Sequence, residues 1–195
     1  MSSLDFVNMH RYQSIETFMY DYVINNKPKT IVELGHGSGA VTVAMAKALH
    51  DLNLYGSEIH SYDLINCNTK YNCMGLPEYA TESAFDRVNN RGLSKYVKFT
   101  SGDIFETFVK TPFKFDLLLI DIDNTWDRLY NILIKNKKVN ELLTSTEVII
   151  EGGDNNHPRI NNNTLSKFNK LMNQTIFSMN YLTGSGRTSI SKLKI

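Results

Sequence analysis

Six acidic side chains fall at or near the ends of predicted β-strands, and they are the residues of this sequence best placed to do chemistry. They are Glu33, Asp63, Asp103, Asp121, Asp123 and Glu151. Carboxylates accept hydrogen bonds from hydroxyl and amino groups and also bind hard divalent cations. Because the carboxyl ends of parallel strands meet at one edge of a sheet, we expect these acids to share one rim of the fold.

A glycine-rich turn follows the first of these strands, with the sequence Glu33-Leu34-Gly35-His36-Gly37-Ser38-Gly39. Glycines let the chain turn sharply and let a ligand approach the backbone closely. The N-terminus of a following helix favours a negatively charged group. Gly35, Gly37 and Ala40 also fit the looser dinucleotide fingerprint, so a nicotinamide cofactor is an alternative to weigh. Either way, the turn indicates a cofactor-binding loop.

Three acids after the fourth and fifth predicted strands suggest a metal. Asp121 and Glu151 end two apolar runs, and Asp154 follows three residues after Glu151. Converging carboxylates repel one another unless a cation joins them, and hard oxygen ligands suit Mg²⁺ or a similar ion. We therefore predict Asp121, Glu151 and Asp154 as metal ligands, with Asp121 and Glu151 nearest the chemistry. His157 precedes a proline in the same region and is a candidate general base.

Alternating strands and helices must position these residues. The apolar pattern predicts five strands, at 30–34, 59–64, 97–100, 115–120 and 147–150. It predicts five helices, at 10–26, 41–52, 78–91, 126–143 and 164–172. Two final strands, at 175–182 and 188–195, are joined by Gly184-Ser185-Gly186. Such alternation implies an α/β fold with a doubly wound, mostly parallel sheet covered by helices on both faces. The closing hairpin adds an antiparallel C-terminal strand.

Length, charge and cysteine content limit the kinds of protein that this sequence can encode. A length of 195 residues fits one domain, with an N-terminal helical segment at 1–27 and a core at 28–195. Lys+Arg total 21 and Asp+Glu total 20, a formal net charge of +1 that disfavours a nucleic-acid partner. No membrane-spanning apolar run or signal peptide is readable, so we expect no membrane partner and a cytoplasmic location. The two cysteines, Cys67 and Cys73, form no disulfide framework or zinc-site pattern.

The segment from Glu33 to Gly39 resembles the E/D-x-G-x-G-x-G motif of class I S-adenosylmethionine (SAM) methyltransferases. The resemblance covers residues 28–195 and implies a Rossmann-like sheet of seven strands in the order 3-2-1-4-5-7-6, with the seventh antiparallel. It implies that Glu33 and the glycines Gly35, Gly37 and Gly39 hold the methionine end of SAM.

The same resemblance assigns the rest of the cofactor. It implies that Asp63, with Leu64 beside it, binds the ribose hydroxyls. An acid after the third strand often binds the adenine amino group in this family, with an apolar neighbour against the ring, which implies these roles for Asp103 and Ile104. Asp121 is a further expected cofactor contact.

Missing motifs narrow the kind of methyltransferase. No Asn/Asp-Pro-Pro-Tyr motif follows the fourth strand, no Pro-Cys nucleophile exists, and Glu151 stands where a ribose 2′-O-methyltransferase of RNA would place a lysine. A nucleic-acid substrate is therefore disfavoured. The stretch Leu119–Trp126, followed by Val148–Glu151, resembles catechol and sugar O-methyltransferases and the cephalosporin hydroxylase-like branch, although Gly152 replaces an expected second acid.

That resemblance implies O-methylation of a small-molecule hydroxyl, with SAM as cofactor and a divalent metal such as Mg²⁺. The absence of a large substrate-capping insertion keeps a second hypothesis open. In it, the chain is a SAM-binding regulatory subunit or a degenerate methyltransferase-fold subunit. Homodimer formation also stays open.

Overall fold

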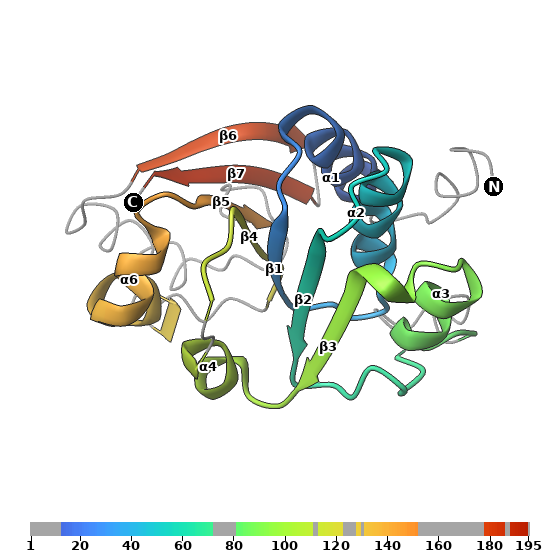
Figure 1. The fold of residues 1–195 in the computed structure, drawn as a ribbon. Helices are drawn as coiled ribbons and strands as arrows, with labels where there is room; N and C mark the ends of the chain where they lie inside the picture. The colour runs from blue at the N-terminus through green and yellow to red at the C-terminus, as the bar shows by residue number, and fades with distance from the viewer. Residues whose placement is uncertain are drawn as a thin grey trace.

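A seven-stranded sheet forms the centre of the protein, seen in a computed structural model that describes residues 13–71, 81–110, 113–122, 128–129, 131–151, 178–185 and 188–194. The strands are β1 (Thr30–Leu34), β2 (Glu58–Asp63), β3 (Val97–Ser101), β4 (Leu117–Ile120), β5 (Glu147–Glu151), β6 (Ser178–Ser185) and β7 (Thr188–Lys194). Their order is β3-β2-β1-β4-β5-β7-β6 (Figure 1). β1 to β5 pair in parallel, and β7 runs antiparallel to both neighbours. The predicted α/β class and strand order are confirmed.

Helices cover both faces of this sheet. They are α1 (Gln13–Asn26), α2 (Ala40–Asp51), α3 (Ala84–Asn90), α4 (Ile104–Thr107) and α6 (Lys137–Leu143), with short 3-10 turns at Ser94–Tyr96 and Phe108–Lys110 and a π-helical turn at Asn131–Lys135. In Figure 1, α1, α2 and α3 lie on one side of the sheet and α4 and α6 on the other. Two apolar clusters match these layers, one containing Met45 of α2 and the other Leu143 of α6.

The central strands are apolar because both of their faces are covered. All four residues of β4 are buried, which explains why its sequence Leu117-Leu118-Leu119-Ile120 is a continuous apolar run rather than an alternating one. β1 lies between β2 and β4. The carboxyl ends of β1, β2 and β4 therefore meet in the middle of the sheet, where the site lies.

The prediction of one helix over 126–143 is wrong for the described residues. A π-helical turn ends at Lys135, and a separate helix, α6, begins at Lys137. Asn136 separates the two because its side-chain oxygen accepts a hydrogen bond from the Val139 N–H at 3.2 Å, which caps α6. An asparagine side chain competes in this way with continuation of the preceding helix.

Two other boundaries and one helix differ from the predictions. α3 begins later than expected, at Ala84, because Ser83 and Asp86 form a reciprocal capping box. Gly184 and Ser185, predicted as part of the turn, lie inside β6 and pair with β7. The short helix α4 between β3 and β4 was not predicted. The predicted helix at 164–172 lies outside the described residues.

Within the described ranges, the helices are too short or too polar for any of them to cross a membrane.

Candidate functional site

The glycine loop after β1 is shaped by close backbone approaches. Gly35 has φ +94°, and a Cβ there would lie 2.0 Å from the Asp121 backbone oxygen, so only glycine fits between this loop and the end of β4. Gly39 has φ +82°, and its Cβ would meet Ala84 of α3 at 2.8 Å. Gly37, at φ +49°, faces open space instead. The loop therefore packs at both ends and leaves its middle glycine accessible.

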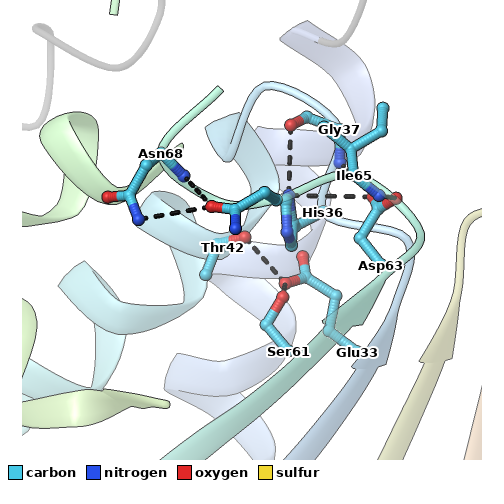
Figure 2. Close-up of polar contacts among 9 residues, drawn as sticks. Glu33, His36, Gly37, Thr42, Ser61, Asp63, Ile65 and Asn68 are labelled. Atoms are coloured by element: carbon cyan, nitrogen blue, oxygen red, sulfur yellow. Dashed lines mark hydrogen bonds and ion pairs between the residues drawn. The ribbon is translucent and has the colours of Figure 1, made fainter. Parts of the chain in front are cut away.

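Asp63, the last residue of β2, fastens this loop. Its Oδ2 accepts a hydrogen bond from the Gly37 N–H at 2.9 Å, and its Oδ1 accepts one from the Ile65 N–H at 2.9 Å (Figure 2). His36 Nδ1 lies 3.7 Å from Asp63 Oδ2. Each carboxylate oxygen keeps further acceptor capacity, so the side chain is held in place and can still bind a ligand's hydroxyl groups.

Glu33 lies beneath the loop, inside β1, and is fully buried. Its Oε2 accepts hydrogen bonds from Thr42 Oγ1 at 2.7 Å and Ser61 Oγ at 2.6 Å (Figure 2). Burial raises the pKa of the Glu33 carboxyl to about 7, an effect opposed by these two hydrogen bonds. Glu33 ties β1 to α2 and β2 and is not among the residues that line the neighbouring pocket.

His36 forms part of the pocket wall, although its side chain is almost completely buried. Its Nδ1 lies 3.1 Å from the Gly37 carbonyl oxygen, and its ring packs edge-on against Phe99 with centroids 5.2 Å apart. Its Nε2 has no hydrogen-bond partner in the described part of the protein, and the same holds for Glu33 Oε1. Two buried polar atoms at the glycine loop therefore lack a partner among the described residues, and a buried water molecule would satisfy them.

A pocket of about 400 Å³ opens at the carboxyl ends of β1, β2 and β4. This volume suits a ligand of nucleoside-derivative size. The pocket brings together predicted site residues from four separate parts of the sequence, namely Gly35, Gly37, Asp63, Leu64, Asp103, Ile104 and Asp121. Gly39 does not line it, because Gly39 packs against α3 instead.

The far end of the pocket is built on the start of α4. Asp103 caps this helix, its Oδ1 accepting from the Phe105 N–H at 2.9 Å. Arg128 Nη2 donates to Asp103 Oδ2 at 2.8 Å. The hydrogen bond from Arg128 is the main cause that lowers the pKa of Asp103 from its usual value. Ile104 and Phe105 supply apolar walls here, and Ile122 also lines the pocket, so this end suits a flat ring that carries a hydrogen-bond donor.

The predicted metal ligands are brought together only in part. β4 and β5 are adjacent and parallel, with Ile120 opposite Ile150, so Asp121 and Glu151 lie at neighbouring strand ends as predicted. Asp121 lines the pocket, whereas Glu151 is buried and does not. Among the described residues, no three His, Cys, Asp or Glu side chains gather as a metal site. Asp154, His157 and Asp123 lie outside the described residues.

Several pocket residues were not predicted from the sequence, including Ile65, Tyr71, Phe105, Ile122 and Arg128. Ile65 and Phe105 each follow a predicted site residue by two positions, which is a signal that could have found them. Arg128 carried no such signal, since it comes 25 positions after its partner Asp103.

Comparisons with known proteins identify the family of this chain. The model of a family described as "Methyltransferase domain" matches residues 32–141, more than half of the chain. A search of curated protein sequences finds no match.

Solved structures share the fold at low sequence identity. A methyltransferase from Podospora anserina, PaMTH1, bound to S-adenosylhomocysteine (SAH), is 15% identical with a TM-score of 0.65, covering 100% of this chain and 79% of that one. An O-methyltransferase from Bacillus cereus in complex with SAH is 16% identical with a TM-score of 0.64, covering 98% of this chain and 85% of that one. The O-methyltransferase TomG from Streptomyces achromogenes, in complex with SAM, is 15% identical with a TM-score of 0.61, covering 93% of this chain and 78% of that one.

Proposed function

We propose that this chain, which belongs to the methyltransferase domain family and is a SAM-dependent methyltransferase, transfers the methyl group to a hydroxyl oxygen of a small molecule. The observation that carries the proposal is the pocket itself. It places a glycine loop, a carboxylate at the end of β2 and a carboxylate beside apolar walls at one edge of the sheet. Those features suit the amino acid, ribose and adenine parts of SAM.

Each part of the cofactor has a proposed partner. The N-terminal end of α2, where Ala40 and Val41 line the pocket together with Gly37, would receive the methionine carboxylate. Asp63, already held by two backbone N–H groups, would accept both ribose hydroxyls. Asp103, with Ile104 and Ile122 on the apolar walls, would accept from the adenine amino group.

Asp121 and the end of β5 would then lie nearest the transferred methyl group. In the proposed reaction a lone pair of the substrate oxygen forms the O–CH₃ bond while the S–CH₃ bond breaks, which leaves neutral SAH. The hydroxyl proton passes to a base, for which Asp121, Glu151 and His157 are the candidates. Two O-methyltransferases among the structural neighbours, one of them involved in tomaymycin synthesis, support the choice of oxygen as acceptor.

The proposal also includes a divalent metal ion that assists methyl transfer. Asp121 and Glu151 fit such an ion in ligand type, because Mg²⁺ takes one or two protein carboxylates and completes its shell with water and substrate oxygens. Asp154 is the third proposed ligand. When bound, the ion would lower the pKa of the acceptor hydroxyl.

Binding and turnover measurements test the proposal. Calorimetry with SAM and SAH should show saturable binding of both, and incubation with SAM and a panel of phenols and sugars should release SAH only when an acceptor is present. Binding without turnover on any acceptor would instead favour the regulatory or degenerate subunit. Absence of SAM and SAH binding by the folded protein would contradict the cofactor assignment.

A further inference from the structure

Arg128 lies at the end of the pocket where Asp103 meets Phe105, and it contacts both residues. Its Nη2 donates to Asp103 Oδ2 at 2.8 Å, and its guanidinium carbon lies 3.8 Å from the centroid of the Phe105 ring. All three residues line the pocket. The guanidinium is thus a flat group that stacks on an aromatic face and donates to a carboxylate.

We propose that Arg128 lowers the affinity of this protein for its cofactor, because its guanidinium and the adenine ring of SAM compete for the same two partners. The inference rests on the proposed function, in which the adenine ring enters this end of the pocket. It assigns Arg128 as a specificity-determining residue for the adenine part of the ligand.

Competition for the acceptor follows from how Asp103 is used. Its Oδ1 accepts the Phe105 N–H and holds the start of α4, so Oδ2 is the oxygen better placed to receive a ligand. Oδ2 is the oxygen that Arg128 binds. A charge-assisted hydrogen bond is about twice as strong as a neutral one, so an adenine amino group that takes this position must displace a stronger donor.

Competition for the ring face adds to this effect. The Arg128 guanidinium lies over the face of Phe105, and one flat group at a time can contact that face closely. The remaining apolar walls, Ile104 and Ile122, offer no hydrogen-bond acceptor in their side chains. A ring bearing an amino group therefore gains most where Arg128 already lies.

Arg128 is able to leave this position at small cost. Its side chain is 54% exposed and that of Asp103 is 38% exposed, so water solvates the guanidinium when the contact opens. Exposed ion pairs and exposed cation–π contacts each contribute little to stability. The competition should therefore weaken SAM binding by only about threefold to tenfold, an amount that removal of the side chain would restore.

A double-mutant cycle on the whole protein tests the proposal. Dissociation constants for SAM, SAH and adenosine would be measured by calorimetry for the natural protein, Arg128→Ala, Asp103→Ala and the double variant. Arg128→Ala should bind all three ligands about threefold to tenfold more tightly, and by the same factor, because all three share the adenine ring. In the Asp103→Ala background the same substitution should have a smaller effect, because only the competition for the Phe105 ring remains.

Two controls separate competition from general charge effects. Lys137→Ala removes a cation whose side chain is 91% exposed and does not line the pocket, and it should leave all three constants unchanged. Raising the salt concentration should shrink the advantage of Arg128→Ala, because screening weakens the exposed ion pair that it removes.

Every other outcome contradicts the proposal. Weaker SAM binding by Arg128→Ala would show that Arg128 holds the cofactor, and unchanged binding would show that the ion pair does not compete. Equal tightening in the Asp103→Ala background would show that Arg128 does not act through Asp103. If the natural protein binds neither SAM nor SAH, the proposed function itself fails, a result distinct from normal binding that Arg128→Ala does not alter.

Discussion

Asp63 shows how much a single residue can do at this site, since it anchors the glycine loop and is the proposed ribose ligand. Two backbone N–H groups, from Gly37 and Ile65, already fix its carboxylate. The side chain is therefore oriented before a ligand arrives, which reduces the entropy lost on binding.

The first prediction removes this side chain. Asp63→Ala should lower SAM affinity by about tenfold to several hundredfold, because hydrogen bonds to a charged group are worth about 1.5–3 kcal/mol each. Calorimetry measures the loss, and a thermal melt checks that the variant folds. Asp63→Asn keeps an acceptor of similar shape and should lose less. Unchanged SAM binding by a folded Asp63→Ala protein would exclude Asp63 as the ribose ligand.

The second prediction compares the two carboxylates in the pocket that contact the nucleoside in our proposal. Asp103→Ala should weaken SAM binding less than Asp63→Ala does, because it loses one contact to a neutral amino group and also removes the partner of Arg128. The two variants would be measured side by side under one set of conditions. The reverse ranking would count against the placement of adenine at Asp103.

At the scale of elements, the glycine loop is shaped by close packing at two of its glycines, and α1 carries a buried carboxyl group, Glu16. In the loop, Gly35 and Gly39 are required by packing, whereas Gly37 faces open space. The middle glycine is therefore the position where a substitution can separate folding from binding.

The third prediction uses a matched pair of glycines. Gly37 and Gly56 both have positive φ, and a Cβ at either would meet nothing within 4 Å. Each change to alanine should cost about 1–2 kcal/mol of stability from backbone strain alone. Gly37→Ala should also weaken SAM binding, since its methyl group would project toward the proposed methionine site, while Gly56→Ala should bind normally. Equal SAM affinity for the two variants would exclude a close approach of the ligand to Gly37.

The fourth prediction concerns α1 and pH. Glu16 is buried on this helix, neither of its oxygens has a hydrogen-bond partner in the described ranges, and burial raises the pKa of its carboxyl to about 8. Above pH 4.5 the unfolded chain ionises Glu16 while the folded protein keeps it protonated. The unfolded state then binds fewer protons, so folding stability decreases as the pH rises from about 4.5 to about 8.

Urea unfolding of the natural protein and of Glu16→Gln between pH 5 and pH 8.5 measures this effect. The natural protein should lose on the order of a few kcal/mol over the range, and Glu16→Gln should lose clearly less because its amide does not ionise. Glu33 accounts for part of the slope that remains, since burial raises the pKa of its carboxyl to about 7. Identical slopes for the two proteins would show that Glu16 is not protonated in the folded state.

At the scale of the whole molecule, the sheet order puts most of the proposed cofactor contacts on strands other than those that lead to Asp121 and Glu151. β1, β2 and β3 carry the proposed cofactor contacts, and β4 and β5 carry Asp121 and Glu151. The two groups of strands meet where β1 pairs with β4. Loss of a metal should thus affect catalysis more than cofactor affinity.

The fifth prediction tests this separation. Excess EDTA should abolish methyl transfer, and Mg²⁺ or Mn²⁺ should restore it, while SAM affinity survives chelation. Asp121→Asn and Glu151→Gln should each lose turnover and keep SAM affinity within a few-fold. Full turnover in excess EDTA would remove the metal from the proposal, and weaker SAM binding by Asp121→Asn would instead place that carboxylate against the cofactor.

The sequence by itself determined the succession of strands and helices along the chain and the residues at the strand ends, and its resemblance to a known family implied the order of the strands in the sheet. Strand periodicity, apolar runs and the glycine turn are local signals, and parallel strands necessarily bring their carboxyl ends to one edge. For that reason Gly35, Asp63, Asp103 and Asp121 were predicted as neighbours although Gly35 and Asp121 lie 86 positions apart in the sequence, and all four line the pocket.

Only the tertiary structure decided which side chains turn toward the pocket and which turn away. Glu33 belongs to the glycine motif, yet Thr42 and Ser61 hold its carboxylate below the loop, because the pleat of β1 directs it there. Arg128 belongs to no motif, yet it reaches Asp103 and Phe105. Such contacts depend on how separate elements pack against one another, and no local spacing in the sequence encodes that geometry.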